Sequence, residues 1–476
     1  MYLLMAVVFV LGYLAIAFEH NIHVDKAASA LLTAILVWTL LVFGADTLLA
    51  SHLTEAGTTA GHGASQFLNV ELRHHLAEIA EILFFLMGAR VIVELIDAPD
   101  GFQPIINRIT TTNAVTMIWV IGILTFFLSA ILDNLTTTIV MVSLLRKIIA
   151  DKETRLWFAG MVVICANAGG AWSPIGAVTT TMLWIGTQIT ATGMIPALFV
   201  PSLVAALVPL GLLTMKFKGQ RIARPADGSP DALHFTPETP LSPATVSNPA
   251  LPITRKTRMT VLSLGLGALA FVPVFKTVTH LPPYMGIMFG VGVLWVVTEL
   301  MHRNHDKYVK SHVTVVGVLS KVDMASILFF LGILLAVSAL ATAGHLADVA
   351  TWLDNTFGNI YVINVLIGLF SSMVDNVPLV AGAMKMYPLV DEATLAGLSG
   401  EALARQTLFA RDGEFWHFLA YCAGTGGSCL IIGSAAGVAA MGMEKIPFMW
   451  YLKRIRGLAV AGYLAVASIY IFIHVL

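Results

Sequence analysis

Long apolar runs alternate with short polar segments along most of the chain. Each run approaches the ~20 apolar residues that an α-helix needs to cross a bilayer, whereas the strands of a membrane barrel alternate over roughly 10 residues. The pattern predicts an all-α polytopic membrane protein with about ten spans. These spans are expected near residues 2–18, 27–45, 78–97, 157–188, 194–215, 259–276, 284–301, 324–342, 415–441 and 457–475.

Two further apolar stretches, 114–150 and 359–391, are too long for one ordinary span. A polar cluster interrupts each of them near its middle, Asp133-Asn134 in the first and Asp375-Asn376 in the second. Either each stretch forms two complete spans, or each forms a re-entrant hairpin that dips to the midplane and returns.

The positions of Lys and Arg favour one topology. If each interrupted stretch enters and leaves on the same face, one side of the membrane carries most of the positive charges. The positive-inside bias makes that crowded side cytoplasmic and places both termini outside. Two complete spans per stretch would preserve the same sidedness, so charge does not decide between the two readings. The sparse outer side then holds Arg73, Lys276, Lys385, Arg405 and Arg411.

Composition agrees with a membrane class. The chain is 57% hydrophobic and 12% charged, whereas a soluble domain is about 25% charged. The lipid bilayer is therefore an expected partner. The net charge of −1 argues against nucleic acid, which needs concentrated basic surface. The three cysteines have no disulfide framework or zinc spacing.

Two polar segments interrupt the apolar pattern. The proline-rich segment 217–256 is expected to be a cytoplasmic linker between a first membrane repeat, 1–216, and a second, 257–476. Segment 46–76, which contains several histidines, is expected to be a polar insertion on the outer face.

The two halves resemble each other in three places and in the same order. Glu81-Ile-Leu-Phe-Phe-Leu-Met87 matches Ser326-Ile-Leu-Phe-Phe-Leu-Gly332, and Leu132-Asp-Asn-Leu135 matches Val374-Asp-Asn-Val377. Gly169-Gly170 likewise matches Gly426-Gly427. Because each half has five spans plus one hairpin, the second copy is inverted relative to the first. Inverted repeats are typical of secondary transporters, whose site lies at the midplane between the repeats.

The interrupting clusters contain candidate ion ligands. A carboxylate deep in a bilayer segment costs roughly 2.5–3.5 kcal/mol, and Asp133 and Asp375 repeat that cost. Carboxylate, amide and hydroxyl oxygens suit a small hard cation. Simple capping of helix ends by Asp and Asn is the alternative. The candidate ligands at the two tips are Asp133, Asn134, Thr136, Thr137, Ser371, Asp375 and Asn376.

Glycine-rich segments at 167–176 and 424–433 form a second element. Glycine inside a span allows either close helix packing or an unwound break. Pro174 and the polar residues nearby favour discontinuous helices, whose exposed ends would complete the site. The candidates there are Asn167, Ser173, Thr180, Thr425 and Ser428.

Acids near the start of two predicted spans form a third element. Glu78, Glu81 and Asp323 are candidates for an auxiliary proton relay, and His74 for pH sensing. Alternatively, these acids only mark membrane entry near a helix N-terminus.

These motifs together resemble the NhaD-type sodium/proton antiporters of the ion transporter superfamily. The resemblance extends over essentially the whole chain and includes 77–86, 132–138, 167–176 and 371–378. It implies an antiporter of the bacterial inner (plasma) membrane that exports Na⁺ or Li⁺ in exchange for H⁺. It also implies a homodimer in which hairpins and broken helices move against a fixed scaffold, without a cofactor.

The combined hypothesis is that Asp133 and Asp375 bind Na⁺ (or Li⁺) and protons competitively. The desolvation of empty carboxylates would then prevent leak. An anion or dicarboxylate carrier of the same fold and a cation channel are the alternatives. An enzyme is not expected, since no Ser/His/Asp set or metal-binding motif lies in the spans.

Overall fold

The computed structural model describes the chain except residues 18, 49–61, 99–110, 224–252, 374 and 476. The described part is helical, and its only β pairing consists of two isolated bridges. This confirms the predicted all-α class.

The first half contains nine described helices, ending before the proline-rich segment. They are α1 (Tyr2–Ala17), α2 (Glu19–Ile22), α3 (Lys26–Leu48), α5 (His62–Asp97), α7 (Ala114–Leu132), α8 (Asn134–Ile148), α9 (Lys152–Gly170), α10 (Val178–Ile185) and α11 (Ala191–Phe217).

The second half runs from α12 to the C-terminus. Its described helices are α12 (Arg255–Thr279), α13 (Pro283–His302), α14 (Lys307–Val313), α15 (Val315–Leu319), α16 (Met324–Thr342), α17 (His345–Phe357), α18 (Ile360–Phe370), α19 (Asn376–Met386), α20 (Glu392–Ala396), α21 (Gly400–Thr407), α22 (Glu414–Gly426), α23 (Ala435–Glu444), α24 (Phe448–Arg454) and α25 (Arg456–Val475).

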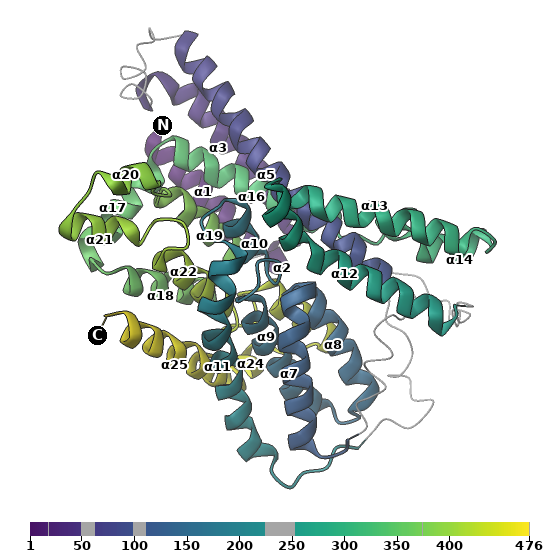
Figure 1. Cartoon of the computed structure of the whole chain (residues 1–476). Helices are drawn as coiled ribbons and strands as arrows, with labels where there is room; N and C mark the ends of the chain where they lie inside the picture. The colour runs from purple at the N-terminus through teal and green to yellow at the C-terminus, as the bar shows by residue number, and fades with distance from the viewer. Residues whose placement is uncertain (18, 49–61, 99–110, 224–252, 374, 476) are drawn as a thin grey trace.

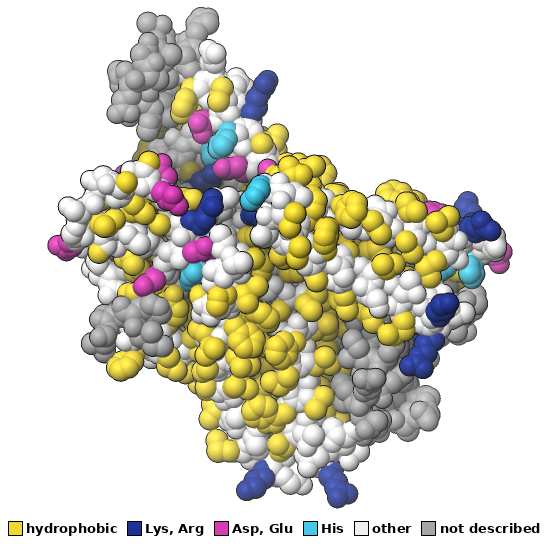
Figure 2. Space-filling view, in the orientation of Figure 1, with side chains coloured by type: hydrophobic (Ala, Val, Ile, Leu, Met, Phe, Trp, Pro, Cys, Tyr) yellow, Lys and Arg dark blue, Asp and Glu magenta, His cyan; other side chains and the backbone are white. Residues whose placement is uncertain are grey.

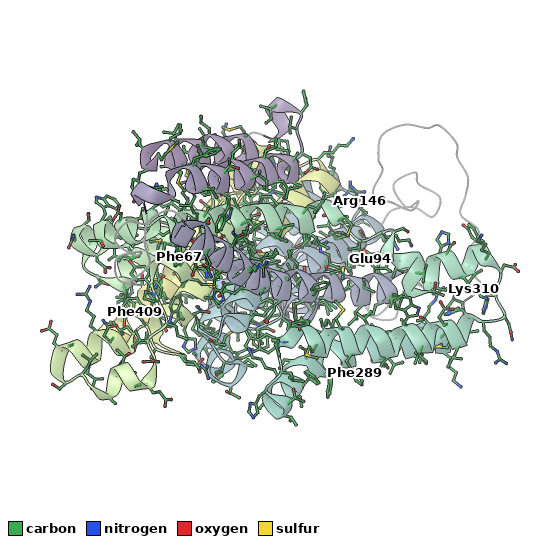
Figure 3. All side chains as sticks on the ribbon, turned by 90° about the horizontal axis from the view of Figure 1, so that it is seen from above. Phe67, Glu94, Arg146, Phe289, Lys310 and Phe409 are labelled. Atoms are coloured by element: carbon green, nitrogen blue, oxygen red, sulfur yellow. The ribbon has the colours of Figure 1, made fainter. Side chains whose placement is uncertain are left out.

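The helices pack into a body from which an arm projects. Helices α12, α13 and α14 form this arm, with Lys310 near its end (Figures 1 and 3). Apolar side chains cover the middle of the visible face, and Lys and Arg side chains lie at its lower end and on the arm (Figure 2). Only 28% of the most apolar window of α12 and 33% of that of α13 are buried, which suits contact with lipid or another apolar surface.

Six described helices are long and apolar enough to cross a membrane, namely α3, α7, α11, α12, α13 and α16. The number rises to eight if each of the bent pairs α17–α18 and α24–α25 is counted as one span. A polytopic membrane protein is therefore confirmed. The total of ten spans with two re-entrant hairpins, and the inversion of the second repeat, stay predictions.

The predicted helix breaks are present in both halves. Residues 171–177 separate α9 from α10, and residues 427–434 separate α22 from α23. The polar clusters also interrupt helices, since α7 ends before Asp133 and α19 begins after Asp375. The two glycine-rich segments therefore form breaks as well as close contacts.

The two halves make equivalent contacts around these breaks. Ser129 Oγ donates to the Ala166 carbonyl at 2.6 Å, and Ser371 Oγ donates to the Ala423 carbonyl at 3.2 Å. A Cβ added to Gly169 would lie 2.1 Å from the Phe126 carbonyl oxygen, and one added to Gly426 would lie 2.0 Å from the Gly368 carbonyl oxygen. Matched hydrogen bonds and matched close approaches support the internal repeat.

Three expectations need correction. Helix α5 begins at His62, so Glu78 and Glu81 lie well inside a 36-residue helix instead of in its first turns. Residues 62–76 are therefore helical and do not form a separate insertion, while 49–61 lie outside the described residues. Residues 224–252, which make up most of the predicted linker, also lie outside the described residues. Helix α17 lies between two predicted apolar stretches, where no helix was expected.

Candidate functional site

The polar cluster at Asp133-Asn134 lies where α7 ends and α8 begins, and it is called the first tip below; the cluster at Asp375-Asn376, where α19 begins, is the second tip. The φ of Asp133, 76°, is in the left-handed region that non-glycine residues rarely adopt, so the surrounding structure must hold it there. Its carboxylate accepts from the Thr136 backbone amide at 2.8 Å and from the Thr136 hydroxyl at 2.9 Å. Asp133 thus caps α8.

The second tip has the same plan. Asp375 caps α19 and accepts from the Val377 amide at 3.4 Å. Pro378 lies in the first turn of α19. Backbone N–H groups in a first turn have no partner within the helix, so the N–H that proline lacks costs no helical hydrogen bond there. Asn376 directly follows Asp375 and is buried. Both aspartates therefore act as helix caps. Each cap uses only part of the oxygen lone pairs, so capping does not exclude cation binding.

A buried amide network joins the first tip to the second half of the chain. Asn134 Nδ2 donates to Asn167 Oδ1 at 2.7 Å. Asn167 Nδ2 then donates to Ser428 Oγ and to Ser434 Oγ, both at 2.9 Å. Asn167 is fully buried at the end of α9, and both serines lie in the break after α22. The structure therefore brings together Asn134, Asn167 and Ser428, as predicted, and adds Ser434.

Other predicted ligands make local hydrogen bonds. Thr180 Oγ1 donates to the Ala177 carbonyl at 2.9 Å, and Thr425 Oγ1 donates to the Tyr421 carbonyl at 2.6 Å. Ser173 Oγ accepts from the Ile175 amide at 3.4 Å. Ser371 donates to carbonyls of α18 and α22. These four hydroxyls reinforce the breaks, and their oxygen lone pairs remain the part that a cation would use.

Four other buried hydroxyls, those of Thr137, Thr138, Thr179 and Ser202, have no hydrogen-bond partner among the described residues. Thr137 Oγ1 lies one turn into α8, and Thr179 Oγ1 lies at the start of α10. An unpaired buried hydroxyl is unfavourable unless a ligand or water pairs with it. Thr137 was predicted as a ligand and Thr179 was not, although it belongs to the threonine run 179–181 after the first glycine-rich segment.

The sequence reasoning missed two cations near the tips. Arg90 of α5 lines a cavity of about 40 Å³ together with Asp133 and Asn134. Arg90 and Asp133 interact electrostatically, as do Lys26 of α3 and Asp375. The signal for Arg90 was present, since an arginine inside a predicted span is costly and usually functional.

Asp323, a predicted relay residue, interacts electrostatically with both of these cations. It caps α16 by accepting from the Ser326 amide at 3.1 Å and from the Ser326 hydroxyl. Burial opposes its ionisation, but these hydrogen bonds and the charges of Arg90 and Lys26 together hold the pKa of Asp323 below its ordinary value. The predicted alternative, an acid favoured at a helix N-terminus, describes Asp323 well.

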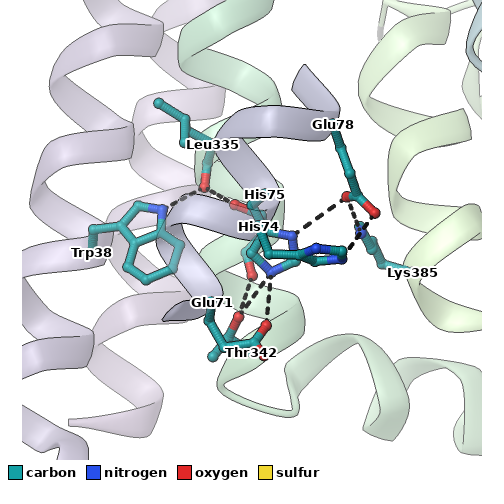
Figure 4. Close-up of polar contacts among 9 residues, drawn as sticks. Trp38, Glu71, His74, His75, Glu78, Leu335, Thr342 and Lys385 are labelled. Atoms are coloured by element: carbon teal, nitrogen blue, oxygen red, sulfur yellow. Dashed lines mark hydrogen bonds and ion pairs between the residues drawn. The ribbon is translucent and has the colours of Figure 1, made fainter. Parts of the chain in front are cut away.

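The remaining predicted relay residues line another cavity. His74, Glu78 and Glu81 face a space of about 390 Å³ between α5, α10, α16 and α19. His74 Nε2 lies 3.3 Å from Glu78 Oε1, and Lys385 Nζ lies 2.7 Å from Glu78 Oε2 (Figure 4). The predicted grouping of these three is therefore present, and Lys385 is an added member.

Comparison with known proteins places this geometry in a transporter family. Residues 13–410 match the family described as citrate transporter (CitMHS). The chain is 43% identical to sodium/proton antiporter 1 of Arabidopsis thaliana over 99% of its length and 72% of that protein. It is 41% identical to sodium/proton antiporter 2 of Arabidopsis thaliana over 99% of both chains.

A bacterial relative is also named as a sodium/proton antiporter. The chain is 28% identical to the Na⁺/H⁺ antiporter NhaD of Vibrio cholerae, over 94% of its own length and 86% of that protein. The chain therefore belongs to the family that the citrate transporter model describes and, within it, to the NhaD-type sodium/proton antiporters.

Proposed function

We propose that this chain exchanges Na⁺ or Li⁺ for protons, and that Asp133 and Asp375 hold the ion or the proton. One observation carries the proposal: each half of the chain interrupts its apolar helices with an aspartate at a helix N-terminus, followed by a buried asparagine. The relatives that are named sodium/proton antiporters support the choice of cation.

Exchange follows from competition for the carboxylates. Na⁺ and H⁺ each neutralise a carboxylate, so occupancy by one excludes the other at the same oxygens. The amides of Asn134 and Asn376 and the hydroxyls of Thr136 and Thr137 supply further oxygens of the hard type that Na⁺ and Li⁺ prefer.

Arg90 and Lys26 supply a reason why Na⁺ transport would be coupled to H⁺ transport. They belong to α5 and α3, whereas the aspartates belong to the tips before α8 and α19. An empty, charged tip is attracted to these cations, and a tip neutralised by Na⁺ or H⁺ is not. Moving an empty tip would separate the charges and desolvate a carboxylate, so only occupied tips cross readily.

The direct test uses vesicles with a trapped pH dye and an acid interior, to which NaCl, LiCl, KCl or succinate is added. Rapid alkalinisation with Na⁺ and Li⁺ only is expected, and Asp133→Asn and Asp375→Asn should each abolish it. Asp391→Asn is the matched control, because Asp391 caps the short helix α20 in the same way but lies outside the site. Full exchange in both site variants would contradict the proposal.

An anion carrier is the second candidate, because the matching family is described as citrate transporter. An alkalinisation response to succinate or citrate instead of Na⁺ would favour it. A cation channel would move Na⁺ without a fixed number of protons, so parallel Na⁺ and H⁺ flux measurements separate it from an antiporter.

We also propose a plasma-membrane location with both termini outside. Two clusters support this sidedness. Of the cations assigned to the outer face, Lys385 lines the cavity of Glu78 and Glu81, and Lys276 interacts electrostatically with Glu81 and Arg411. On the proposed cytoplasmic side, Glu444 accepts from Arg146 at 2.7 Å and from Arg155 at 3.0 Å. Labelling of single cysteines added at residues 2 and 475 in intact cells tests the sidedness.

A homodimer completes the proposal. The exposed apolar faces of α12 and α13, which include Phe289, need a cover of lipid or of a second copy. Native mass spectrometry of the detergent-solubilised chain is expected to give twice the 51.0 kDa chain mass. A monomer at all detergent concentrations would contradict this part alone.

A further inference from the structure

The cavity of about 390 Å³ has a charged rim and an apolar floor. His74, Glu78, Glu81 and Lys385 form the rim. Met182 of α10 and Ala381 of α19 belong to the floor. A space of this size and polarity admits water and hydrated small cations from the rim.

The floor of the cavity adjoins the segment of the second tip. Met182, Val377 and Ala381 are buried in one apolar cluster with Ile82. Val377 is two residues after Asp375, so this cluster adjoins both the cavity and the segment that carries Asp375. Apolar side chains packed in this way exclude water and ions. Packing of this kind would close the direct route from this cavity to Asp375.

Helix α19 connects the two places. Its 11 residues begin at Asn376, directly after Asp375, and its last turn carries Lys385. At 1.5 Å per residue the helix is ~16 Å long and moves as one rigid unit. A contact that holds Lys385 in place therefore also restrains the tip that carries Asp375.

Glu78 makes that contact. Lys385 Nζ lies 2.7 Å from Glu78 Oε2, while His74 and His75 approach the same carboxylate at 3.3 and 3.6 Å (Figure 4). Of the remaining α5 groups, Glu71 lies 3.5 Å from His75, and Glu81 interacts electrostatically with Glu78 and with Lys276 of α12. From α16 and the α10–α11 turn, the neutral side chains of Ser338, Thr342 and Gln188 face the group.

The pair is exposed enough to exchange. The side chain of Glu78 is 45% exposed and that of Lys385 is 30% exposed. Ion pairs at such exposure are weak and compete with dissolved ions. A cation that enters the cavity meets the Glu78 carboxylate already occupied by the lysine ammonium.

We propose that Lys385 is a positioning residue of the transport cycle, a tethered cation that holds α19 against α5 by occupying Glu78 until an entering cation takes its place. The inference rests on the proposed cation exchange and adds the event that opens the cavity floor. Arginine at 385 would preserve the pair, and glutamine would remove it.

The opening is measured by thiol labelling of the full chain in detergent. Ala381→Cys places a thiol in the floor, and the native cysteines are buried, so the unmodified chain is the blank. A water-soluble maleimide should react slowly with Ala381→Cys and at least tenfold faster when Lys385→Gln is added. Lys385→Arg should remain slow. NaCl should accelerate the reaction in the Lys385 protein more than choline chloride at equal concentration.

Transport supplies the second readout. Lys385→Gln should lower the half-saturating Na⁺ concentration several-fold, because Glu78 is then free for Na⁺, and Glu78→Gln should raise it. Arg405→Gln is the matched control, since Arg405 makes an exposed ion pair with Asp354 at 3.3 Å away from this cavity.

The outcomes separate the two claims. Unchanged labelling and unchanged half-saturation in Lys385→Gln would overturn the inference while leaving the proposed function intact. Equal acceleration by NaCl and choline chloride would reduce the effect to screening and also overturn it. If the unmodified protein exchanges no cation at all, the proposed function fails, and the labelling rates still decide whether Lys385 holds α19.

Discussion

Asn167 Nδ2 donates to Ser428 Oγ at 2.9 Å, and this hydrogen bond joins two residues that are 261 positions apart in the sequence. It connects the end of α9 in the first half to the break after α22 in the second half. With Asn134 on its other side, Asn167 makes the two halves share one buried polar network. A single side chain thus ties the first tip to the other repeat.

Replacing Asn167 by Ala should therefore destabilise the protein and weaken ion binding. The change leaves the Asn134 amide and the Ser428 and Ser434 hydroxyls without this partner, and each orphaned buried group costs about 1–3 kcal/mol. We expect a lower melting temperature in detergent and a higher half-saturating Na⁺ concentration. Asn69→Ala is the control, because Asn69 is exposed and, among the described residues, its hydrogen bond stays within its own helix. Equal melting of the two variants would contradict this account of the network.

Removing the charge of Arg90 should weaken the coupling between Na⁺ flux and H⁺ flux. Without the cation beside Asp133, an empty tip is less strongly retained, so Na⁺ can cross in one direction while the tip returns empty. In Arg90→Gln vesicles, Na⁺ flux measured with a sodium dye should exceed H⁺ flux, whereas the two remain proportional in the unmodified protein. Lys310→Gln, at the end of the arm, should leave that ratio unchanged (Figure 3). A constant ratio in Arg90→Gln would refute the retention mechanism.

Adding a methyl group at Gly169 should be strongly unfavourable. The new Cβ would lie 2.1 Å from the Phe126 carbonyl oxygen, and backbone must move to relieve it. Overpacking of this kind typically costs 1–3 kcal/mol or more. Gly211→Ala is a matched helical control, since nothing lies within 4 Å of its Cβ position, and it should raise stability by about 0.5–1 kcal/mol. Thermal unfolding of both variants measures the difference, and opposite signs are expected.

Asp323 should make stability depend on acid pH. Its folded-state pKa is lowered, so its contribution is present above the ordinary aspartate pKa of about 3.9 and is lost as pH falls through the lower folded value. Asp323→Asn keeps a helix cap without a titrating charge, and so its melting temperature should fall less than that of the unmodified protein below about pH 4. Asp323→Ala should cost about 1 kcal/mol near neutral pH. Parallel curves for Asp323→Asn and the unmodified protein would exclude the effect.

The sequence by itself determined the class and the helix breaks, and it supplied the candidates for the site. Apolar runs of bilayer length leave helices as the simplest structure, because lipid offers backbone groups no other hydrogen-bond partners. Asp133, Asp375 and the glycine-rich segments stood out because polar residues and glycines inside apolar runs are unfavourable unless they have a role. Their duplication also marked the two tips as equivalent.

The tertiary structure alone decided which side chains meet. No local pattern predicts that Lys385 pairs with Glu78, 307 residues away, or that Asn167 bonds to Ser428. The start of α5 was misplaced because its polar first part, 62–76, lacks the apolar run by which spans were recognised. Arg90 and Lys26 were missed as partners of the tips for a related reason. Electrostatic attraction depends on distance in space, and sequence separation carries no information about that distance.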